Sequence, residues 1–306
     1  MRQERLTTVA IGCLATVLAA ALSVSVGAPA SSDVGDASTT PIAPTAAFTV
    51  SSFNVLGSSH TIHSRRWASG TTRIRWGAKL LANHGTDVVG FNELQQDQLA
   101  KFREVTGRSY GIYPGAELLW KDSNNSIAWR KNMWALVKKR TFNIPYFNGG
   151  KRAMPIVLLR HKATGLSAYF VNVHNPATNR KHRDSRRYRI RATTIEIDLV
   201  NHLRQSGLPV FILGDMNERD YYFCRMTGEA PMKAARGGTN RDGRCDAQNP
   251  PSVSWIFGSK GLAFSGYVED NSEFAQKITD HRVLFSDVHI DGVRFPQALS
   301  APASAQ

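Results

Sequence analysis

The chain has 306 residues, of which 42% are hydrophobic and 20% are charged, and its formal net charge is +14. This composition is typical of a folded protein with a substantial core, and it excludes a disordered chain and a bundle of membrane-spanning helices. The positive charge should attract polyanions, with DNA, RNA and anionic lipid headgroups as candidates. A role in solubility or in adhesion to a cell wall is the alternative.

The N-terminus has the pattern of an export signal. Arg2 and Arg5 precede an apolar run over residues 8–26, and a small-residue cleavage pattern ends at Ala30. We therefore expect residues 1–30 to be a signal peptide cleaved near Ala30, and the mature protein to be secreted. A retained membrane anchor is the alternative. No other stretch is long and apolar enough to span a bilayer, so we expect no stable membrane insertion.

Composition divides the rest of the chain into three parts. Residues 31–46 consist largely of Ser, Thr, Pro, Ala and Asp, which predicts a flexible leader. Residues 47–293 contain the apolar runs and are expected to form one large domain, which we expect to be monomeric. Residues 294–306 are expected to be a disordered tail.

The apolar runs of the domain predict interleaved strands and helices. Most runs are continuously apolar rather than alternating, which is typical of strands covered on both faces in packed sheets flanked by helices. In the last helix, Ile190, Thr194, Ile197 and Leu203 are expected to share a face. Strands are expected at 48–55, 87–94, 126–130, 135–137, 155–160, 167–173, 209–213, 252–257 and 282–290, and helices at 72–83, 95–105 and 183–205.

The cysteines predict one disulfide. Cys13 belongs to the expected signal, so the mature chain keeps Cys224 and Cys245. In an oxidising compartment such an even pair is expected to be bonded. The segment 224–251 is rich in Gly, Arg and Asn and has little periodicity, which predicts a long loop tied at its base by this disulfide.

Polar residues recur where the predicted strands end. Alone, each would be explained as a turn former, a partly exposed carboxylate or a structural histidine. Together they combine carboxylates, amides and histidines at the edge of a sheet, where a ligand would meet the strand ends. The residues are Asn54, Glu93, His174, Asp215, Asn217, Asp280 and His281.

Four short motifs that contain these residues resemble those of a known family. Gly-Phe-Asn-Glu-Leu, Val-Asn-Val-His, Gly-Asp-Met-Asn and Thr-Asp-His follow one another in the order found in the endonuclease/exonuclease/phosphatase superfamily, which includes deoxyribonuclease I. The resemblance covers about residues 47–290. Within this superfamily, the chain resembles a secreted, bacterial-type member. The resemblance implies an α/β (α+β) fold, a four-layer sandwich of two packed, mostly antiparallel β-sheets flanked by helices.

The resemblance also implies a metal site. Glu93 would bind a divalent cation with Asn54 beside it, and Asp280 would complete the metal side. Hard oxygen ligands suit Mg²⁺, with Mn²⁺ or Ca²⁺ as alternatives. Such a cation neutralises the charge of a phosphodiester, which otherwise resists attack by water.

The same resemblance implies roles for the remaining polar residues. Asp215 and Asn217 would orient the attacking water and the phosphate. His281 would act as general base or as a hydrogen-bond donor in the transition state, and His174 would contact the phosphate from the other side. Asp280 adjoins His281 and belongs to the same catalytic group.

The chain departs from the family pattern at Ser254. Relatives usually carry Asp there, in a segment that orients the final histidine, whereas this chain has Ser-Val-Ser-Trp-Ile-Phe at 252–257. A hydroxyl can orient an imidazole but adds no charge, so His281 is expected to be less basic than in relatives. Glu269 or Asp270 is the alternative partner of His281.

These observations favour a secreted, metal-dependent phosphodiesterase, and export together with basicity favours an extracellular endonuclease acting on DNA or RNA. Arg183, Arg186 and Arg187 lie at helical spacing and are expected to bind the phosphate backbone. A solvated helix face is the alternative explanation.

Two other functions remain open. A sphingomyelinase-like lipid phosphodiesterase would need an exposed apolar segment, for which 221–223 is the candidate, because 255–257 has the pattern of a buried strand. A catalytically weakened polyanion-binding module is suggested by Ser254, although retention of the other polar residues argues against it.

Overall fold

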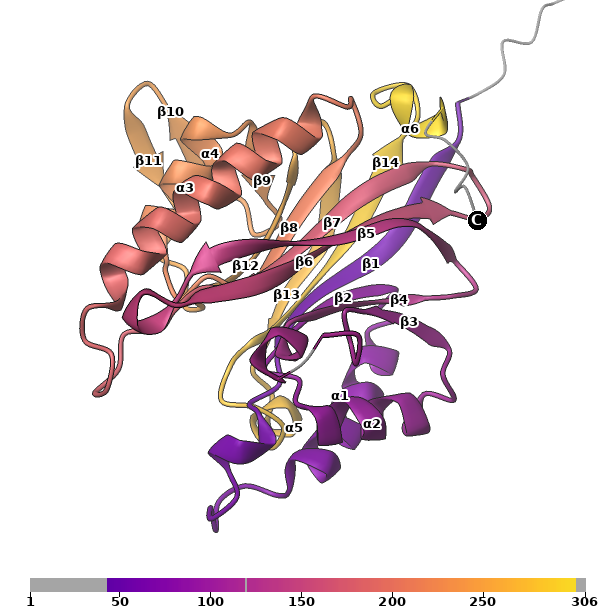
Figure 1. The fold of residues 1–306 in the computed structure, drawn as a ribbon. Coiled ribbons are helices and arrows are strands. Elements are labelled where there is room, and N and C mark those ends of the chain that lie inside the picture. Colours follow the sequence, from indigo (N-terminus) through magenta and orange to yellow (C-terminus); the bar gives the residue numbers. More distant parts are fainter. Residues whose placement is uncertain (1–42, 119, 301–306) are drawn as a thin grey trace, which may run out of the picture. The chain divides into compact units, whose positions relative to one another are not determined.

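The computed structural model describes residues 43–118 and 120–300, which belong to one compact unit. The expected signal peptide and most of the expected leader lie outside the described residues. Two six-stranded β-sheets pack face to face, and helices cover their outer faces (Figure 1). No helix in 43–118 or 120–300 is long and apolar enough to cross a membrane.

The first sheet has the strand order β13-β14-β1-β2-β4-β3. Its only parallel pair is β1 with β2, and its other neighbours are antiparallel. The strands are β1 (Thr45–Asn54), β2 (Val88–Asn92), β3 (Tyr110–Tyr113), β4 (Ser126–Arg130), β13 (Ala263–Asp270) and β14 (Val283–Asp291).

The second sheet has the order β5-β6-β7-β8-β12-β9 and also holds one parallel pair, β7 with β8. A separate two-stranded sheet is formed by β10 and β11. The strands are β5 (Trp134–Pro145), β6 (Lys151–His161), β7 (Ser167–His174), β8 (Val210–Asp215), β9 (Met232–Ala234), β10 (Thr239–Arg241), β11 (Arg244–Asp246) and β12 (Ser254–Ser259).

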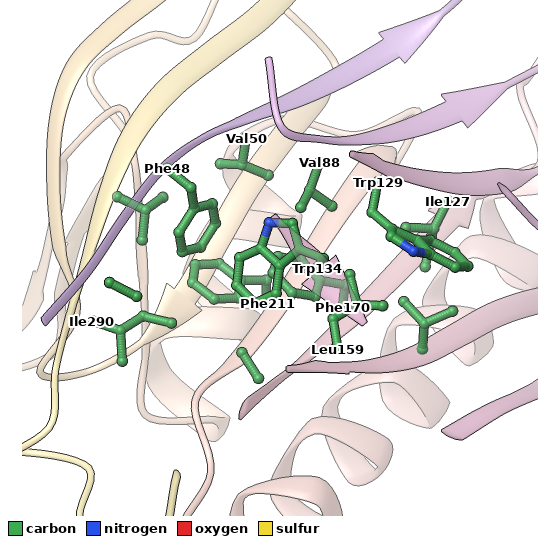
Figure 2. Packing of buried hydrophobic residues seen from close by; sticks show 14 of the residues in the cluster. Phe48, Val50, Val88, Ile127, Trp129, Trp134, Leu159, Phe170, Phe211 and Ile290 are labelled. Carbon is green, nitrogen blue, oxygen red and sulfur yellow. The ribbon is translucent and has the colours of Figure 1, made fainter. Parts of the chain in front are cut away.

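The main core fills the space between the two sheets. Phe48 of β1 meets Trp134 of β5 edge-on, with ring centroids 4.9 Å apart, and Phe170 stacks on Phe211 at 4.9 Å (Figure 2). Truncating one such buried aromatic side chain typically costs about 3–5 kcal/mol. This dry layer therefore sets the spacing of the two sheets.

Helices bury the outer faces and complete four layers. The first sheet is covered by α1 (Gly70–Asn83) and α2 (Gln96–Val105), and the second by α3 (Ser185–Arg204) and α4 (Asp220–Glu229). The expected sandwich is thus confirmed. Short helical turns are η1 (Ser58–His60), η2 (Trp120–Asn124), η3 (Phe147–Gly149), α5 (Glu273–Gln276) and α6 (Gln297–Ser300).

The buried face of α3 differs from the one expected. Ala192, Glu196 and Val200 point into the layer together with Ile197 and Leu203, whereas Thr194 is exposed and Ile190 is only partly covered. The apolar content of this helix is low, so packing against β5 and β8, rather than its own pattern, decides which face is buried.

The expected long loop at 224–251 is wrong. Its first residues belong to α4, in which Tyr222, Phe223 and Met226 are buried against the second sheet, and β9, β10 and β11 follow. The Cys224–Cys245 disulfide is confirmed and joins α4 to β11, with Cα atoms 5.7 Å apart.

Both expected ends of the domain also differ. β1 already pairs at Thr45, opposite Asp291 of β14. At the other end, Phe295 and Ala298 are buried in the core between the sheets, so residues 294–300 are not a disordered tail. Two apolar side chains within a polar segment are a weak sequence signal. Residues 301–306 lie outside the described residues.

Candidate active site

The strand ends of both sheets converge on one cluster of polar side chains. Asn54 is the last residue of β1, and Asp215 is the last residue of β8. The Asn54 amide nitrogen donates to Asp215 Oδ2 at 3.1 Å and to Glu93 Oε1 at 3.2 Å. The structure therefore brings together residues 161 positions apart, as the strand-end pattern predicts.

Glu93 is the carboxylate on the side of the first sheet. Its oxygens accept from Asn54 and from the Gly57 backbone N–H at 3.0 Å, and its Oε2 lies 3.3 Å from His60 Nε2. Burial alone would raise the pKa of Glu93, but His174 and these three groups outweigh burial and hold its pKa below the usual value. Glu93 is therefore a carboxylate at neutral pH.

Asp215 is the carboxylate shared by both histidines. It is 1% exposed, and its Oδ2 lies 3.6 Å from His281 Nδ1 and 3.7 Å from His174 Nε2. Its Oδ1 accepts from the Asn217 backbone N–H at 2.9 Å. A fixed carboxylate between two imidazole rings can orient both rings.

Unusual backbone conformations occur at these strand ends. Glu93 has φ 61°, Asn217 has φ 50° and Leu56 has φ 54°. Residues other than glycine rarely adopt this left-handed region, and such strain concentrates at functional sites. Gly214 has φ 132°, and a Cβ at this position would lie 2.0 Å from the Val173 carbonyl oxygen, so only glycine fits before Asp215.

A basic cavity of about 430 Å³ is lined by His182, and aromatic ring contacts run from His182 to His174 of the cluster. Phe147 stacks on His182 at 3.9 Å, and the neighbouring Tyr146 ring lies 6.4 Å from the His174 ring. Tyr146 and Phe147 therefore link the cavity to the cluster. The cationic side chains that line it are Arg180, Lys181, Arg183 and Arg187.

The three arginines expected to bind phosphate do not share one surface. Arg183 and Arg187 line this cavity, where Arg187 also pairs with Asp184 at 2.8 Å. Arg186 points elsewhere, with its guanidinium carbon 5.7 Å from the centroid of the Tyr221 ring on α4. The prediction from helical spacing therefore grouped three arginines whose side chains do not face one common surface.

The sequence profile of the endonuclease/exonuclease/phosphatase family matches residues 51–281. The chain belongs to this family. The resemblance of the four motifs is thereby confirmed, and with it membership in a family of hydrolases that act on phosphoester bonds and generally depend on a divalent metal.

Solved structures of this family resemble the chain over most of its length. An endonuclease/exonuclease/phosphatase family protein from Bacteroides thetaiotaomicron has a TM-score of 0.64 at 16% identity, covering 81% of this chain and 97% of that chain. A mannosyl-6-phosphatase of the same species has a TM-score of 0.60 at 16% identity, covering 79% of this chain and 99% of that chain. The human Nocturnin catalytic domain with bound sulfate has a TM-score of 0.60 at 16% identity, covering 80% of this chain and 96% of that chain. At this identity the likeness shows the fold alone. No curated protein matches the chain.

The donor set fits the divalent cation that the family implies. Glu93 and Asp280 line one cavity of about 420 Å³, and the Asp280 side chain is 52% exposed. Within 43–118 and 120–300 no group of three or more His, Cys, Asp or Glu is arranged as a metal cage. Mg²⁺ needs no such cage, because one or two carboxylates, waters and a substrate phosphate complete its octahedron.

Asn54 bridges the two carboxylates through its amide nitrogen. Its oxygen accepts from the Leu56 backbone N–H at 3.1 Å, and its nitrogen faces the two carboxylates, Glu93 and Asp215. The Asn54 nitrogen also lies 3.5 Å from His281 Nε2. In this arrangement Asn54 holds the carboxylates in place, and Glu93 and Asp280 are the candidate oxygen ligands of a cation.

Neither acid expected to replace the missing aspartate contacts His281. Glu269 pairs with Arg236 and accepts from Tyr267, and Asp270 lies 3.1 Å from His84 Nε2. Their expected role is wrong, because both side chains are engaged elsewhere in the first sheet. Asp215 is the carboxylate that faces His281 Nδ1.

Ser254 lies in β12 directly opposite Asp215 in the strand pairing. It is buried, and its hydroxyl oxygen has no hydrogen-bond partner among the described residues. The expectation that this hydroxyl orients His281 therefore has no support in the contacts.

Two residues of the cluster were not predicted from the sequence. His60 faces Glu93 from an exposed turn, and its only signal is that it follows Asn54 by a few residues. Asn92 lies at the end of β2, and its side-chain oxygen accepts from the Asp215 backbone N–H at 2.9 Å. Its position inside the Gly-Phe-Asn-Glu-Leu motif is the sequence feature that could have identified it as a site residue.

Proposed function

We propose that the chain is a secreted, divalent-cation-dependent phosphodiesterase that hydrolyses nucleic acid. The observation that carries this proposal is the presence of cationic side chains in two cavities, one at the carboxylate–histidine cluster and one connected to the cluster by aromatic contacts. Arg183 and Arg187 line the cavity that contains His182, and Arg66 lines the cavity that holds His281. A substrate with one phosphate would use one of these surfaces, whereas a strand carries a phosphate for each of them.

In this proposal Glu93 and Asp280 hold the cation, which is Mg²⁺ or, alternatively, Mn²⁺ or Ca²⁺. The cation supplies neutralisation of the phosphate charge. The two residues that would hold it line the same cavity as His281. The low pKa of Glu93 supports this role, because the ligand must be ionised at the working pH.

The remaining residues move the proton and hold the phosphate. Asp215 is fixed by Asn54 and by the Asn217 N–H, so it is positioned to accept the proton of the attacking water. The Asn217 side chain is itself held by the Asn175 carbonyl at 2.8 Å. His174 and His281 would then donate hydrogen bonds to the phosphoryl oxygens, where negative charge develops.

Export is the part of the proposal that rests on the N-terminal sequence. The Cys224–Cys245 disulfide supports it, because disulfides persist in oxidising compartments. Mass spectrometry of the mature protein from culture medium should give an N-terminus near Ser31. Retention of the full chain in the membrane fraction would contradict export.

The lipid alternative loses its candidate segment. Tyr222 and Phe223 are buried in the layer between α4 and the second sheet, so residues 221–223 cannot enter a membrane. The strand at 255–257 is buried as expected.

The experiment uses circular single-stranded DNA and supercoiled plasmid as substrates for the purified mature protein in Mg²⁺. Cleavage of either circle is read on a gel, because one cut converts it to a new form. We expect cleavage that stops in EDTA and in His281→Ala, and that persists in Arg191→Ala, an exposed position on α3 outside both cavities. Intact circles in both Mg²⁺ and Mn²⁺ would overturn the nuclease proposal.

A further inference from the structure

Residues 58–69, which comprise η1 and the segment that leads to α1, form one wall of the cavity that holds Glu93 and Asp280. It is fixed by Arg73, a fully buried residue of α1. Arg73 donates to Thr61 Oγ1 at 3.1 Å and to the Ala68 carbonyl at 3.1 Å within the segment. It also donates to the carbonyls of Val55, Leu56 and Ile278 at 2.6–2.8 Å, beside the cluster. The wall is therefore tied rigidly to the candidate catalytic residues.

An aromatic ring and a guanidinium group stand in this wall. Trp67 and Arg66 both line the cavity, and the guanidinium carbon of Arg66 lies 5.1 Å from the centroid of the Trp67 ring. Their backbone N–H groups both donate to Ser64 Oγ, at 3.1 and 3.3 Å. The pair is thus held in place by its own turn, and Arg66 remains exposed.

We propose that this cavity is a subsite for the nucleotide next to the scissile phosphate, with its base packed on the Trp67–Arg66 pair. Aromatic rings and guanidinium planes are the groups on which bases stack, and Arg66 also offers charge to the adjoining phosphate. In a duplex both faces of a base are already covered by its neighbours. The subsite therefore selects an unpaired base, and a single strand is the preferred substrate. This inference rests on the proposed function and names its substrate class.

The charges of the wall oppose a choline headgroup. The Trp67 ring has a second guanidinium group, that of Arg73, 5.8 Å from its centroid. An aromatic ring attracts a cation through its negative face, but the positive charges of two guanidinium groups at this ring repel a quaternary ammonium group. Of the exposed large hydrophobic residues in the described chain, the segment carries only Ile62, which is too little to enter a bilayer.

The test compares a short oligothymidylate, an abasic strand of the same length and the corresponding duplex as substrates in Mg²⁺. The variants are Trp67→Ala, Trp67→Phe and the matched control Arg65→Ala, an exposed neighbour that does not line the cavity. We expect Trp67→Ala to raise KM for oligothymidylate by about 5-fold or more with little change in kcat, and to leave the abasic strand unaffected. Trp67→Phe should keep most of the affinity, and Arg65→Ala should match the wild type.

Two outcomes would overturn the subsite while the nuclease stands. One is an equal effect of Trp67→Ala on the oligothymidylate and the abasic strand, and the other is a duplex cleaved faster than the single strand. Thermal unfolding of each variant controls for misfolding. If the wild type cleaves no strand, the proposed function has failed. Fluorescence anisotropy of labelled oligothymidylate in EDTA then still tests the subsite, because loss of binding in Trp67→Ala supports it and unchanged binding overturns it.

The last part of the test measures binding of the protein to vesicles of sphingomyelin and phosphatidylserine. Binding to these vesicles that is lost in Ile62→Ser, together with no discrimination between base-containing and abasic strands, would assign the segment to a membrane and overturn the nucleotide subsite. Absence of vesicle binding, with the expected KM change, supports it.

Discussion

Asn92 of β2 and Asn172 of β7 face each other across the two sheets, and each donates a hydrogen bond to the backbone of the opposite sheet. Asn92 Nδ2 donates to the Val173 carbonyl at 3.0 Å, and Asn172 Nδ2 donates to the Phe91 carbonyl at 2.8 Å. Both side chains are fully buried. These bonds fix the two parallel strand pairs relative to each other, and so they set the distance between the two halves of the candidate site.

Replacing Asn172 by Ala should destabilise the protein. The change removes its bonds to the Phe91 carbonyl and to the Ser126 carbonyl at 3.2 Å, and it leaves buried polar groups without partners. We expect the free energy of unfolding to fall by about 2 kcal/mol, measured by urea unfolding. Asn271→Ala, in an exposed turn, is the control. Equal stability of the two variants would show that the contact between the sheets contributes nothing.

Replacing Ser254 by Ala should have almost no effect. The Ser254 hydroxyl is buried without a hydrogen-bond partner among the described residues, so its removal leaves no group newly unpaired. We expect unchanged or slightly higher thermal stability, and the same pH dependence of phosphodiesterase activity as in the wild type. A shifted pH profile in Ser254→Ala would mean that the hydroxyl orients His281 after all.

The elements predicted correctly are those whose strands are buried on both faces. The expected strand at 126–130 matches β4 residue for residue, because its continuous apolar run reflects coverage by the core and by the helices. β13 was missed because it is an edge strand with no fully buried residue and an irregular register between Ser265 and Val268. α4 was missed because its first turns are aromatic and its surroundings are rich in Gly and Arg.

The residues of the candidate site that could be predicted from the sequence are those that lie at the ends of strands. The side chains of Glu93 and Asp215 follow apolar runs, and the parallel pairing of each sheet brings such ends together. Contacts formed by tertiary packing left no trace in the sequence. Glu196 is an example, because a single acidic residue within a helix reads as exposed, yet it is buried beneath the site and accepts from Asn175 at 3.4 Å.

Glu196 should make stability depend on pH. Burial raises its pKa to about 7 from 4.5, although Tyr222 and Asn175 act in the opposite direction. Between these two values the unfolded state loses the proton and the folded state keeps it, so the free energy of unfolding falls as pH rises and levels off above 7. The full effect is on the order of 3 kcal/mol.

The variant Glu196→Gln removes this dependence. Compared with the wild type, it should show little difference in urea unfolding below pH 4.5 and a clear gain in stability above pH 7. The control is Asp198→Asn on the exposed face of α3, which should show no such difference between the two conditions. A constant difference at all pH values would contradict a protonated Glu196.

Arg183 and Arg187, which line the basic cavity that contains His182, should determine how salt weakens binding to nucleic acid. Each side chain that neutralises a phosphate of a single strand contributes about 0.7 to the slope of log affinity against log salt concentration. Replacing Arg183 and Arg187 together by Ala should therefore reduce this slope by about 1.4, measured by fluorescence anisotropy with labelled oligothymidylate in EDTA. Arg186→Ala should change the slope less, because Arg186 packs on Tyr221 instead of lining the cavity. An equal reduction by Arg191→Ala would mean that the strand responds to the overall charge of α3 and not to this cavity.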